Sequence, residues 1–242
     1  MMRGCYIGVI PDSVIQYQQT PQRDFMYRAS DIHKAIAKAT ENGWSVCGES
    51  IDTIIQVLND RAMFVPTRTG ESSIGWLTAS SSHERSLPGF STRYGLGRFP
   101  LHTDGAHMQN PPDMIFLQFE QATRDAPTLL LHSNRNDIDA DVICALEHGI
   151  FDIGFRHRTR LGTALASDRI RFDPIAMTPR DSLAQQVVEY FEDRWLHAET
   201  YESPGSTETL VIDNRWTLHG REAVPMNMTR RLRRLMLRWS AS

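Results

Sequence analysis

Two histidines and one aspartate are the residues whose types and spacing could hold a metal ion. His102 and Asp104 are two positions apart, so in an extended strand their side chains would lie on one face, opposite Thr103. Two imidazoles and one carboxylate on one face of a metal are the arrangement expected for oxygen-activating non-haem Fe(II). His219 is the best candidate for the third ligand, because residues 210–214 form an apolar run that predicts a strand leading into a turn.

A basic run near the C-terminus could bind an anion. If residues 230–239 form a strand, alternate side chains share a face. Either choice of inner face then places arginines inside the fold, and Arg230 and Arg234 would be about 13 Å apart, at about 3.3 Å per residue. A buried guanidinium needs a planar anionic partner, and a carboxylate held by two hydrogen bonds is the natural one. The alternative is a solvated basic strand that binds phosphate or nothing.

The elements that must position these residues are mostly short strands. The predicted strands are 6–10, 63–66, one carrying His102 and Asp104, 114–119, 128–132, 151–155, 210–213 and about 230–239. The predicted helices are 30–42, 51–61, 137–147 and one opened by Pro179 and Asp181. Many short strands with few helices between them predict a mainly β fold with flanking helices, a barrel or a double-sheet jelly roll.

The chain of 242 residues is expected to form one domain, with N-terminal helices and a lid-like loop in 1–95 and the jelly-roll core in 96–242. The composition of residues 67–91 predicts a long irregular connection, interrupted by a short apolar stretch at 74–77. We expect this connection to cover the mouth of the site.

Composition narrows the class of protein. A net charge of −3 and a pI near 6.3 give no nucleic-acid signature, and no apolar stretch approaches a membrane span. Three widely separated cysteines, Cys5, Cys47 and Cys144, indicate reduced thiols. We therefore expect a soluble cytoplasmic protein that acts on a small molecule, binds neither nucleic acid nor membrane, and could form a homo-oligomer.

Several motifs in series resemble the taurine dioxygenase and clavaminate synthase-like family of Fe(II)- and 2-oxoglutarate-dependent oxygenases, whose fold is a double-stranded β-helix (jelly roll, cupin-like). The resemblance runs from about residue 96 to 237. Its motifs are His102-x-Asp104, Gly105-Ala106-His107 followed by Pro111-Pro112, Thr128, Asp213-Asn214, Leu218-His219-Gly220-Arg221 and the closing Arg230-x-Leu232-x-Arg234.

The resemblance implies a role for each matched position. The two histidines and Asp104 would hold Fe(II), which together with 2-oxoglutarate and O₂ makes up the cofactor set. Arg230 would receive the far carboxylate of 2-oxoglutarate, with the hydroxyl of Thr128 beside it. Arg234 would either reinforce this contact or receive an acidic group of the substrate. Apart from the resemblance, we expect Arg221 to pair with a core carboxylate and to support the turn that carries His219.

The activity implied is hydroxylation of an unactivated C–H bond of a small polar metabolite, such as a free amino acid or a natural-product intermediate. One alternative keeps these cofactors but ends in desaturation or oxidative cyclisation. A further alternative is a non-catalytic jelly-roll module whose arginines bind an anionic ligand. A hydrolase is disfavoured because the chain has no Gly-x-Ser-x-Gly motif.

Overall fold

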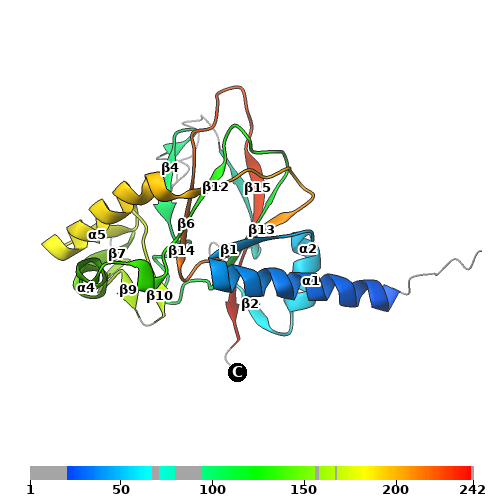
Figure 1. Ribbon diagram of the computed structural model, residues 1–242, viewed down its shortest axis with the longest axis horizontal. Helices are drawn as coiled ribbons and strands as arrows, with labels where there is room; N and C mark the ends of the chain where they lie inside the picture. Colours follow the sequence, from blue (N-terminus) through cyan, green and yellow to red (C-terminus); the bar gives the residue numbers. More distant parts are fainter. Residues whose placement is uncertain (1–20, 67–70, 80–93, 156–157, 167, 241–242) are drawn as a thin grey trace, which may run out of the picture.

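The computed structural model describes residues 21–66, 71–79, 94–155, 158–166 and 168–240 (Figure 1). The strand predicted at 6–10 lies outside these ranges, as does most of the predicted lid over 67–91. The prediction of a single domain over 1–242 therefore stays a prediction.

Within the described ranges the helices are α1 (Pro21–Asn42), α2 (Ile51–Leu58), α4 (Ala140–His148) and α5 (Ser182–Asp193), with 3-10 turns η1 (Arg135–Asp137) and η2 (Arg194–His197). The strands of the first half are β1 (Trp44–Cys47), β2 (Ala62–Phe64), β3 (Ile74–Thr78), β4 (Phe99–His102), β5 (Met114–Phe119) and β6 (Thr128–His132). The later strands are β7 (Phe151–Phe155), β8 (Arg158–Gly162), β9 (Leu165–Ala166), β10 (Arg169–Ile170), β11 (Met177–Pro179), β12 (Glu199–Tyr201), β13 (Thr209–Asp213), β14 (Thr217–Arg221) and β15 (Arg231–Trp239).

Two antiparallel sheets form the centre of the molecule. The larger has the order β1-β13-β5-β15-β2, with β3 also paired to β15, and the smaller has the order β12-β6-β14-β4. Strands distant in sequence are neighbours in both sheets, as expected for the predicted jelly roll. A separate three-stranded sheet, β11-β7-β8, and the hairpin β9–β10 lie to one side of them (Figure 1).

Alternation along the strands divides the apolar side chains between an interior and two outer layers. The apolar residues between the sheets include Ile115, Leu117, Phe119, Leu130, Leu210, Ile212, Leu232 and Met236. The opposite faces carry Leu235 and Leu237, which pack with α1 and α2, and Leu129 and Leu131, which pack with α4 and α5. The prediction of a mainly β fold with flanking helices is confirmed.

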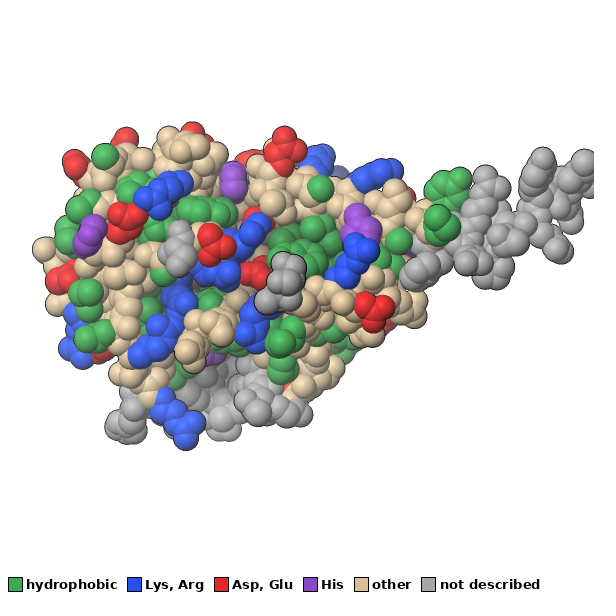
Figure 2. Space-filling model, turned by 90° about the horizontal axis from the view of Figure 1, so that it is seen from below, with side chains coloured by type: hydrophobic (Ala, Val, Ile, Leu, Met, Phe, Trp, Pro, Cys, Tyr) green, Lys and Arg blue, Asp and Glu red, His purple; other side chains and the backbone are tan. Residues whose placement is uncertain are grey.

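Surface ion pairs also join the layers. The two terminal nitrogens of Arg233 in β15 each donate a hydrogen bond to one carboxylate oxygen of Asp52 in α2, both at 2.7 Å. Basic and acidic side chains lie close to one another on the face shown in Figure 2. Exposed pairs of this kind contribute at most about 1 kcal/mol each to stability, so the buried layers decide the fold.

Most predicted elements are present, and several of their boundaries differ. Helix α1 already includes Pro21, although the predicted helix starts at residue 30. Helix α2 ends at Leu58 instead of 61, and α4 begins at Ala140, after a 3-10 turn, instead of 137. Strand β4 ends at His102, so Asp104 lies in the following turn and not in the strand.

His219 was predicted to lie in a turn, and this is wrong. The turn after β13 is short, and His219 is the central residue of β14. It pairs with His102 of β4 on one side and with Leu130 of β6 on the other. None of the helices that the structure describes combines the length and apolarity needed to cross a membrane.

Candidate metal centre

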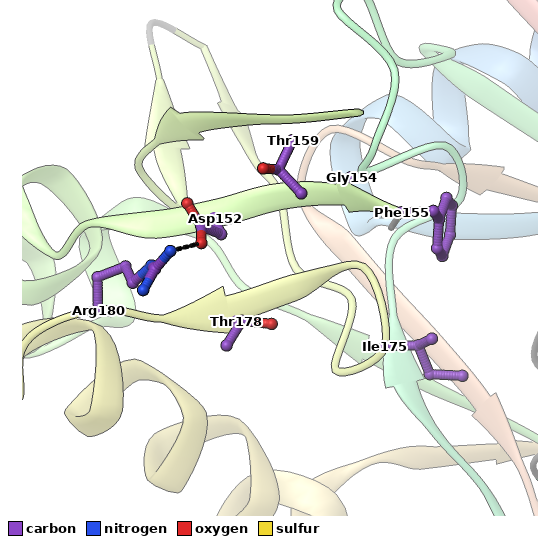
Figure 3. Close-up of a pocket in the computed structure, with 7 residues that line it drawn as sticks. All are labelled: Asp152, Gly154, Phe155, Thr159, Ile175, Thr178 and Arg180. Carbon is purple, nitrogen blue, oxygen red and sulfur yellow. Dashed lines mark ion pairs between the residues drawn. The ribbon is translucent and has the colours of Figure 1, made fainter. Parts of the chain in front are cut away.

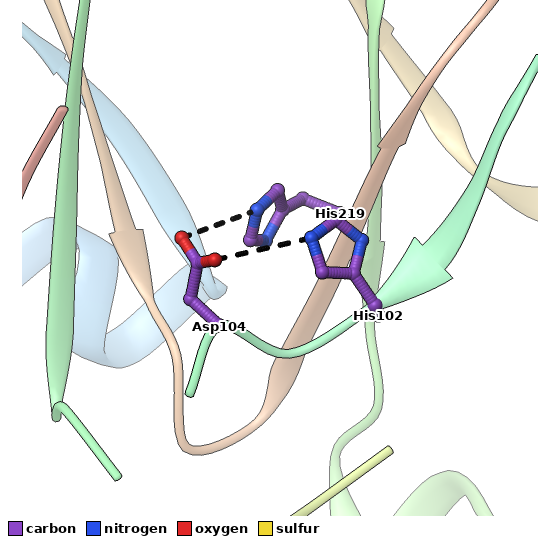
Figure 4. A group of neighbouring side chains, drawn as sticks. All are labelled: His102, Asp104 and His219. Carbon is purple, nitrogen blue, oxygen red and sulfur yellow. Dashed lines mark ion pairs between the residues drawn. The ribbon is translucent and has the colours of Figure 1, made fainter. Parts of the chain in front are cut away.

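His102, Asp104 and His219 converge in the interior between the two sheets (Figure 4). One ligand atom from each lies within 4.8 Å of the others, and the three residues are 5%, 5% and 7% exposed. The two histidines are paired across β4 and β14, with ring centroids 4.4 Å apart. The structure thus brings together the three residues that the sequence analysis selected.

The backbone fixes the tautomer of His102. Its Nδ1 lies 3.0 Å from the carbonyl oxygen of Pro100, which can only accept a hydrogen bond, so Nδ1 carries the proton. Nε2 of His102 then faces Oδ1 of Asp104 at 4.0 Å, and Nε2 of His219 faces Oδ2 at 3.7 Å. Both Nε2 atoms point towards one carboxylate. The ring of His102 is oriented through its other nitrogen, as is usual for metal-ligating histidines.

The protonation states suit a divalent cation. Burial acts to raise the pKa of Asp104, but Arg234 and the two histidines together hold this pKa below its usual value. Burial lowers the pKa of His219 to about 3, so its ring is neutral. Oδ2 of Asp104 and Nδ1 of His219 are buried without a hydrogen-bond partner among the described residues. A carboxylate oxygen left unpaired in the interior is costly, and a bound cation would satisfy it.

Arg234 lies beside this group on β15. Its Nη1 donates to Oδ1 of Asp104 at 2.6 Å, and its side chain is 11% exposed. It shares the inward face of β15 with Leu232 and Met236, as the alternation predicts. The guanidinium thus touches one oxygen of the candidate ligand and leaves the other oriented towards His219.

Arg230, just before β15, meets Thr128 of β6. Its Nη2 donates to the Thr128 hydroxyl at 2.8 Å and its Nε to the carbonyl of Ala126 at 3.2 Å, and its guanidinium lies 5.0 Å from the ring centre of Phe119. Burial, and then the nearby charge of Arg221, lower its pKa to about 9, which leaves it positive at neutral pH. No carboxylate in the described part of the chain forms an ion pair with it, so this cation can accept an anionic ligand.

Arg221 has no carboxylate partner among the residues that the structure describes, contrary to the prediction. It donates to the backbone carbonyls of Gly95, Gly97 and Glu222, and burial lowers its pKa to about 10. The three carbonyl oxygens accept hydrogen bonds from both terminal nitrogens of the guanidinium, but they do not neutralise its charge. Its side chain fixes the segment that leads into β4.

Asp173 is a buried carboxylate that the sequence analysis missed. The N–H of Thr103 donates to the carbonyl of Phe172 at 2.8 Å, which brings the segment with Asp173 beside the one that carries His102. Its Oδ1 accepts the backbone N–H groups two and three residues further on, at 2.7 and 2.9 Å. Burial raises its pKa, and the charge of His102 opposes this rise. No pattern in the sequence marks it, because its position depends on a pairing between distant segments.

An open cavity of about 500 Å³ lies on the sheet β11-β7-β8 (Figure 3). An ion pair between Asp152 and Arg180 lies at one end, and Phe155 and Ile175 lie at the other. None of the three metal-site residues lines it. Because the ring of Phe155 also packs against His107, with centroids 5.0 Å apart, the cavity adjoins the segment that follows the metal site.

No protein-family model and no curated protein sequence matches the chain. Solved structures do match. An asparagine oxygenase in complex with Fe(II), 2S,3S-3-hydroxyasparagine and succinate has a TM-score of 0.67 at 16% identity, over 87% of this chain and 79% of that chain.

A second protein gives similar matches. The non-heme iron oxygenase OrfP in complex with Fe has a TM-score of 0.61 at 15% identity, over 87% of this chain and 78% of that chain. OrfP in complex with Fe, succinate and (3S)-hydroxy-L-Arg has a TM-score of 0.58 at 16% identity, over 76% of this chain and 66% of that chain. At these identities the comparisons show that the chain has the jelly-roll fold of these non-haem iron oxygenases.

Proposed function

We propose that this protein is an Fe(II)- and 2-oxoglutarate-dependent dioxygenase that hydroxylates a C–H bond of a free amino acid. The observation that carries the proposal is the buried convergence of His102, Asp104 and His219, whose donor atoms lie within 4.8 Å of one another. Two imidazoles and an ionised carboxylate form the facial set that suits non-haem Fe(II) and leaves positions open for other ligands. The fold shared with two iron oxygenases supports the same choice of metal.

Arg230 and Thr128 would bind the far carboxylate of 2-oxoglutarate. The guanidinium is partly buried and cationic and has only neutral acceptors within the described ranges. A dicarboxylate would supply the missing charge through paired N–H···O bonds, which are the strongest contacts that an arginine makes. The Thr128 hydroxyl already accepts a hydrogen bond from Nη2 of Arg230. This bond orients the plane of the guanidinium towards the interior.

The protein's own contribution is to hold and orient the reactants. Bound Fe(II), 2-oxoglutarate and O₂ would supply the oxidising power that an unactivated C–H bond requires. His102 and His219 would present Nε2 to the ion. Arg234 holds the pKa of Asp104 down and, by its hydrogen bond to Oδ1, leaves Oδ2 facing His219. The buried side chains around them exclude water from the site.

The amino-acid substrate class rests on charge complementarity. Asp173 places a buried carboxylate near the candidate ligands, within electrostatic reach of His102. An amine, amidine or amide group of a substrate would supply the N–H donors that this carboxylate lacks from Lys or Arg in the described structure. The asparagine oxygenase and OrfP structures contain hydroxylated amino acids, which supports the same class.

The decisive experiment is an anaerobic titration of the purified protein with Fe(II) and 2-oxoglutarate. We expect a weak visible charge-transfer band to appear only when both are present, and succinate to form once O₂ is admitted. Product mass then separates the outcomes, because hydroxylation adds one oxygen and desaturation or ring closure removes two hydrogens. Absence of both the band and succinate, with the protein folded, would refute the proposal.

Asp173→Asn tests the substrate class separately. Asparagine keeps an acceptor oxygen for the two backbone N–H groups and removes only the charge. Free L-amino acids are screened for perturbation of the visible band, and the best of them is titrated against both proteins. We expect at least a tenfold loss of affinity for that amino acid and an unchanged band with Fe(II) and 2-oxoglutarate alone. Equal affinities would remove Asp173 from substrate recognition.

A further inference from the structure

Asp104 lies outside the strand that carries His102, so no sheet ladder holds its backbone. We propose that Asn214 is the positioning residue that holds Asp104 in place for the metal. Asn214 lies in the turn between β13 and β14, on the same hairpin as His219. The inference rests on the proposed function and adds to it the residue that fixes two distant ligands relative to each other.

The contacts of the Asn214 side chain are specific. Its Oδ1 accepts the backbone N–H of Asp104 at 2.9 Å, and its Nδ2 donates to the carbonyl oxygen of the same residue at 3.0 Å. Nδ2 also donates to the carbonyl of Pro112 at 2.9 Å. One side-chain amide therefore reproduces for Asp104 the pair of hydrogen bonds that a neighbouring strand would supply.

The amide is fully used and buried. A primary amide has two N–H donors and one acceptor oxygen, and each of these groups has a partner. Asn214 is 2% exposed, and its own backbone N–H donates to the carbonyl of Asp113 at 2.9 Å. Since the anchor is itself held by its backbone, it can fix Asp104 instead of moving with it.

The chain direction after Asp104 makes such an anchor necessary. Gly105 has a φ of +69°, and a Cβ there would lie 2.7 Å from Cδ of Pro112. The chain therefore turns sharply directly after the candidate ligand and returns beside Pro112. Asn214 contacts both sides of this turn, which determines where the Asp104 side chain begins.

Asparagine in a turn commonly hydrogen-bonds to backbone groups of that same turn. Asp213 does so, since its Oδ1 accepts the N–H of Arg215 at 3.0 Å. Asn214 instead reaches a segment 110 positions away. A residue needed only for the local turn would not require that contact.

Asn214→Ala and Asn214→Asp separate positioning from general stability. Alanine removes all three side-chain bonds, whereas aspartate keeps the shape and the acceptor but places a second oxygen against the carbonyls of Asp104 and Pro112. Ser45→Ala is the matched control, because Oγ of Ser45 is buried and donates to the carbonyl of Ala35 at 2.6 Å on the outer side of the larger sheet.

Fe(II) affinity is measured anaerobically by calorimetry, and Co(II) is added as a spectroscopic probe of ligand geometry. Circular dichroism and urea unfolding establish that each variant is folded. We expect both Asn214 variants to bind Fe(II) about 10–100-fold more weakly, as outer partners of metal ligands typically do, and to show a changed Co(II) visible spectrum. Ser45→Ala is expected to lose stability and keep wild-type metal affinity and spectrum.

Two results would overturn the inference. If a folded Asn214 variant binds Fe(II) as tightly as the wild type with an unchanged Co(II) spectrum, Asn214 does not position the ligand, while the proposed function stands. If the wild type binds neither ion, the proposed function and this inference both fail. Asn214→Asp preserves the test if the alanine variant does not fold.

Discussion

The glycine beside His219 is expected to be essential, and Gly220→Ala tests this. An added Cβ would lie 2.6 Å from the backbone oxygen of Phe99 and 3.2 Å from the carbonyl group of Pro100, where ordinary contact begins at 3.4 Å. The atoms it meets belong to the backbone of β4, so no flexible side chain can move aside. Strands β4 and β14 would have to separate at the point where His102 and His219 are paired.

The magnitude follows from this overlap. Forcing an extra methyl group into a well-packed interior typically costs about 1–3 kcal/mol, so we expect the free energy of unfolding to fall by about that amount. A displacement of β4 from β14 also moves one imidazole relative to the other. We therefore expect weaker Fe(II) binding in addition to the loss of stability.

The assay is urea unfolding followed by anaerobic Fe(II) calorimetry, with Gly48→Ala as the control. Gly48 has no heavy atom within 4 Å of the position of an added Cβ, so the same substitution there should change stability by no more than about 0.5 kcal/mol. If Gly220→Ala is as stable as Gly48→Ala and binds Fe(II) with wild-type affinity, the close contact between β4 and β14 is not required.

Two further predictions concern pH and the cosubstrate. Burial holds the pKa of His132 below its usual 6.5 in the folded protein. Above pH 6.5 the imidazole is neutral in both the folded and the unfolded chain, and the folded state is not penalised. As the pH falls below 6.5 the unfolded chain takes up the proton more readily, so the free energy of unfolding decreases. Urea unfolding between pH 8 and 5 should therefore show a shallower pH dependence in His132→Asn, and equal slopes would contradict this. Arg230→Lys should weaken 2-oxoglutarate binding at least tenfold because lysine cannot form the paired contact. Arg233 lies on the outer face of β15, so the Arg233→Lys variant should bind 2-oxoglutarate normally. Equal affinities of the two variants for 2-oxoglutarate would remove Arg230 from the cosubstrate site.

Local patterns were sufficient to predict much of the fold. Strands β5, β6, β7 and β13 coincide with short apolar runs, and α5 begins where Asp181 caps it, with the Asp181 carboxylate accepting the N–H of Ala184 at 2.8 Å. Alternation also predicted correctly that Leu232, Arg234 and Met236 share one face of β15. These features depend on neighbouring residues, which the sequence displays directly.

The differences arise where distant segments decide the structure. Residues 217–221 contain a glycine, a histidine and an arginine and have weak intrinsic strand preference, but hydrogen bonds from β4 and β6 on both sides make them a strand. Asp104 leaves the strand because Gly105 turns the chain, and Asn214 replaces the missing ladder. Asp173 reaches the site through the pairing of Thr103 with Phe172. Sequence spacing predicted which residues meet but not the contacts that hold them.

The most direct test of the central claim is the Fe(II) stoichiometry of the wild type and of three single variants, His102→Ala, Asp104→Ala and His219→Ala. Calorimetry under anaerobic conditions should give one Fe(II) per chain for the wild type and a large loss of affinity in each variant, because each substitution removes one of three buried candidate ligand atoms. Wild-type affinity in His219→Ala, or absence of Fe(II) binding by the folded wild type, would contradict the convergence of these three side chains on one ion.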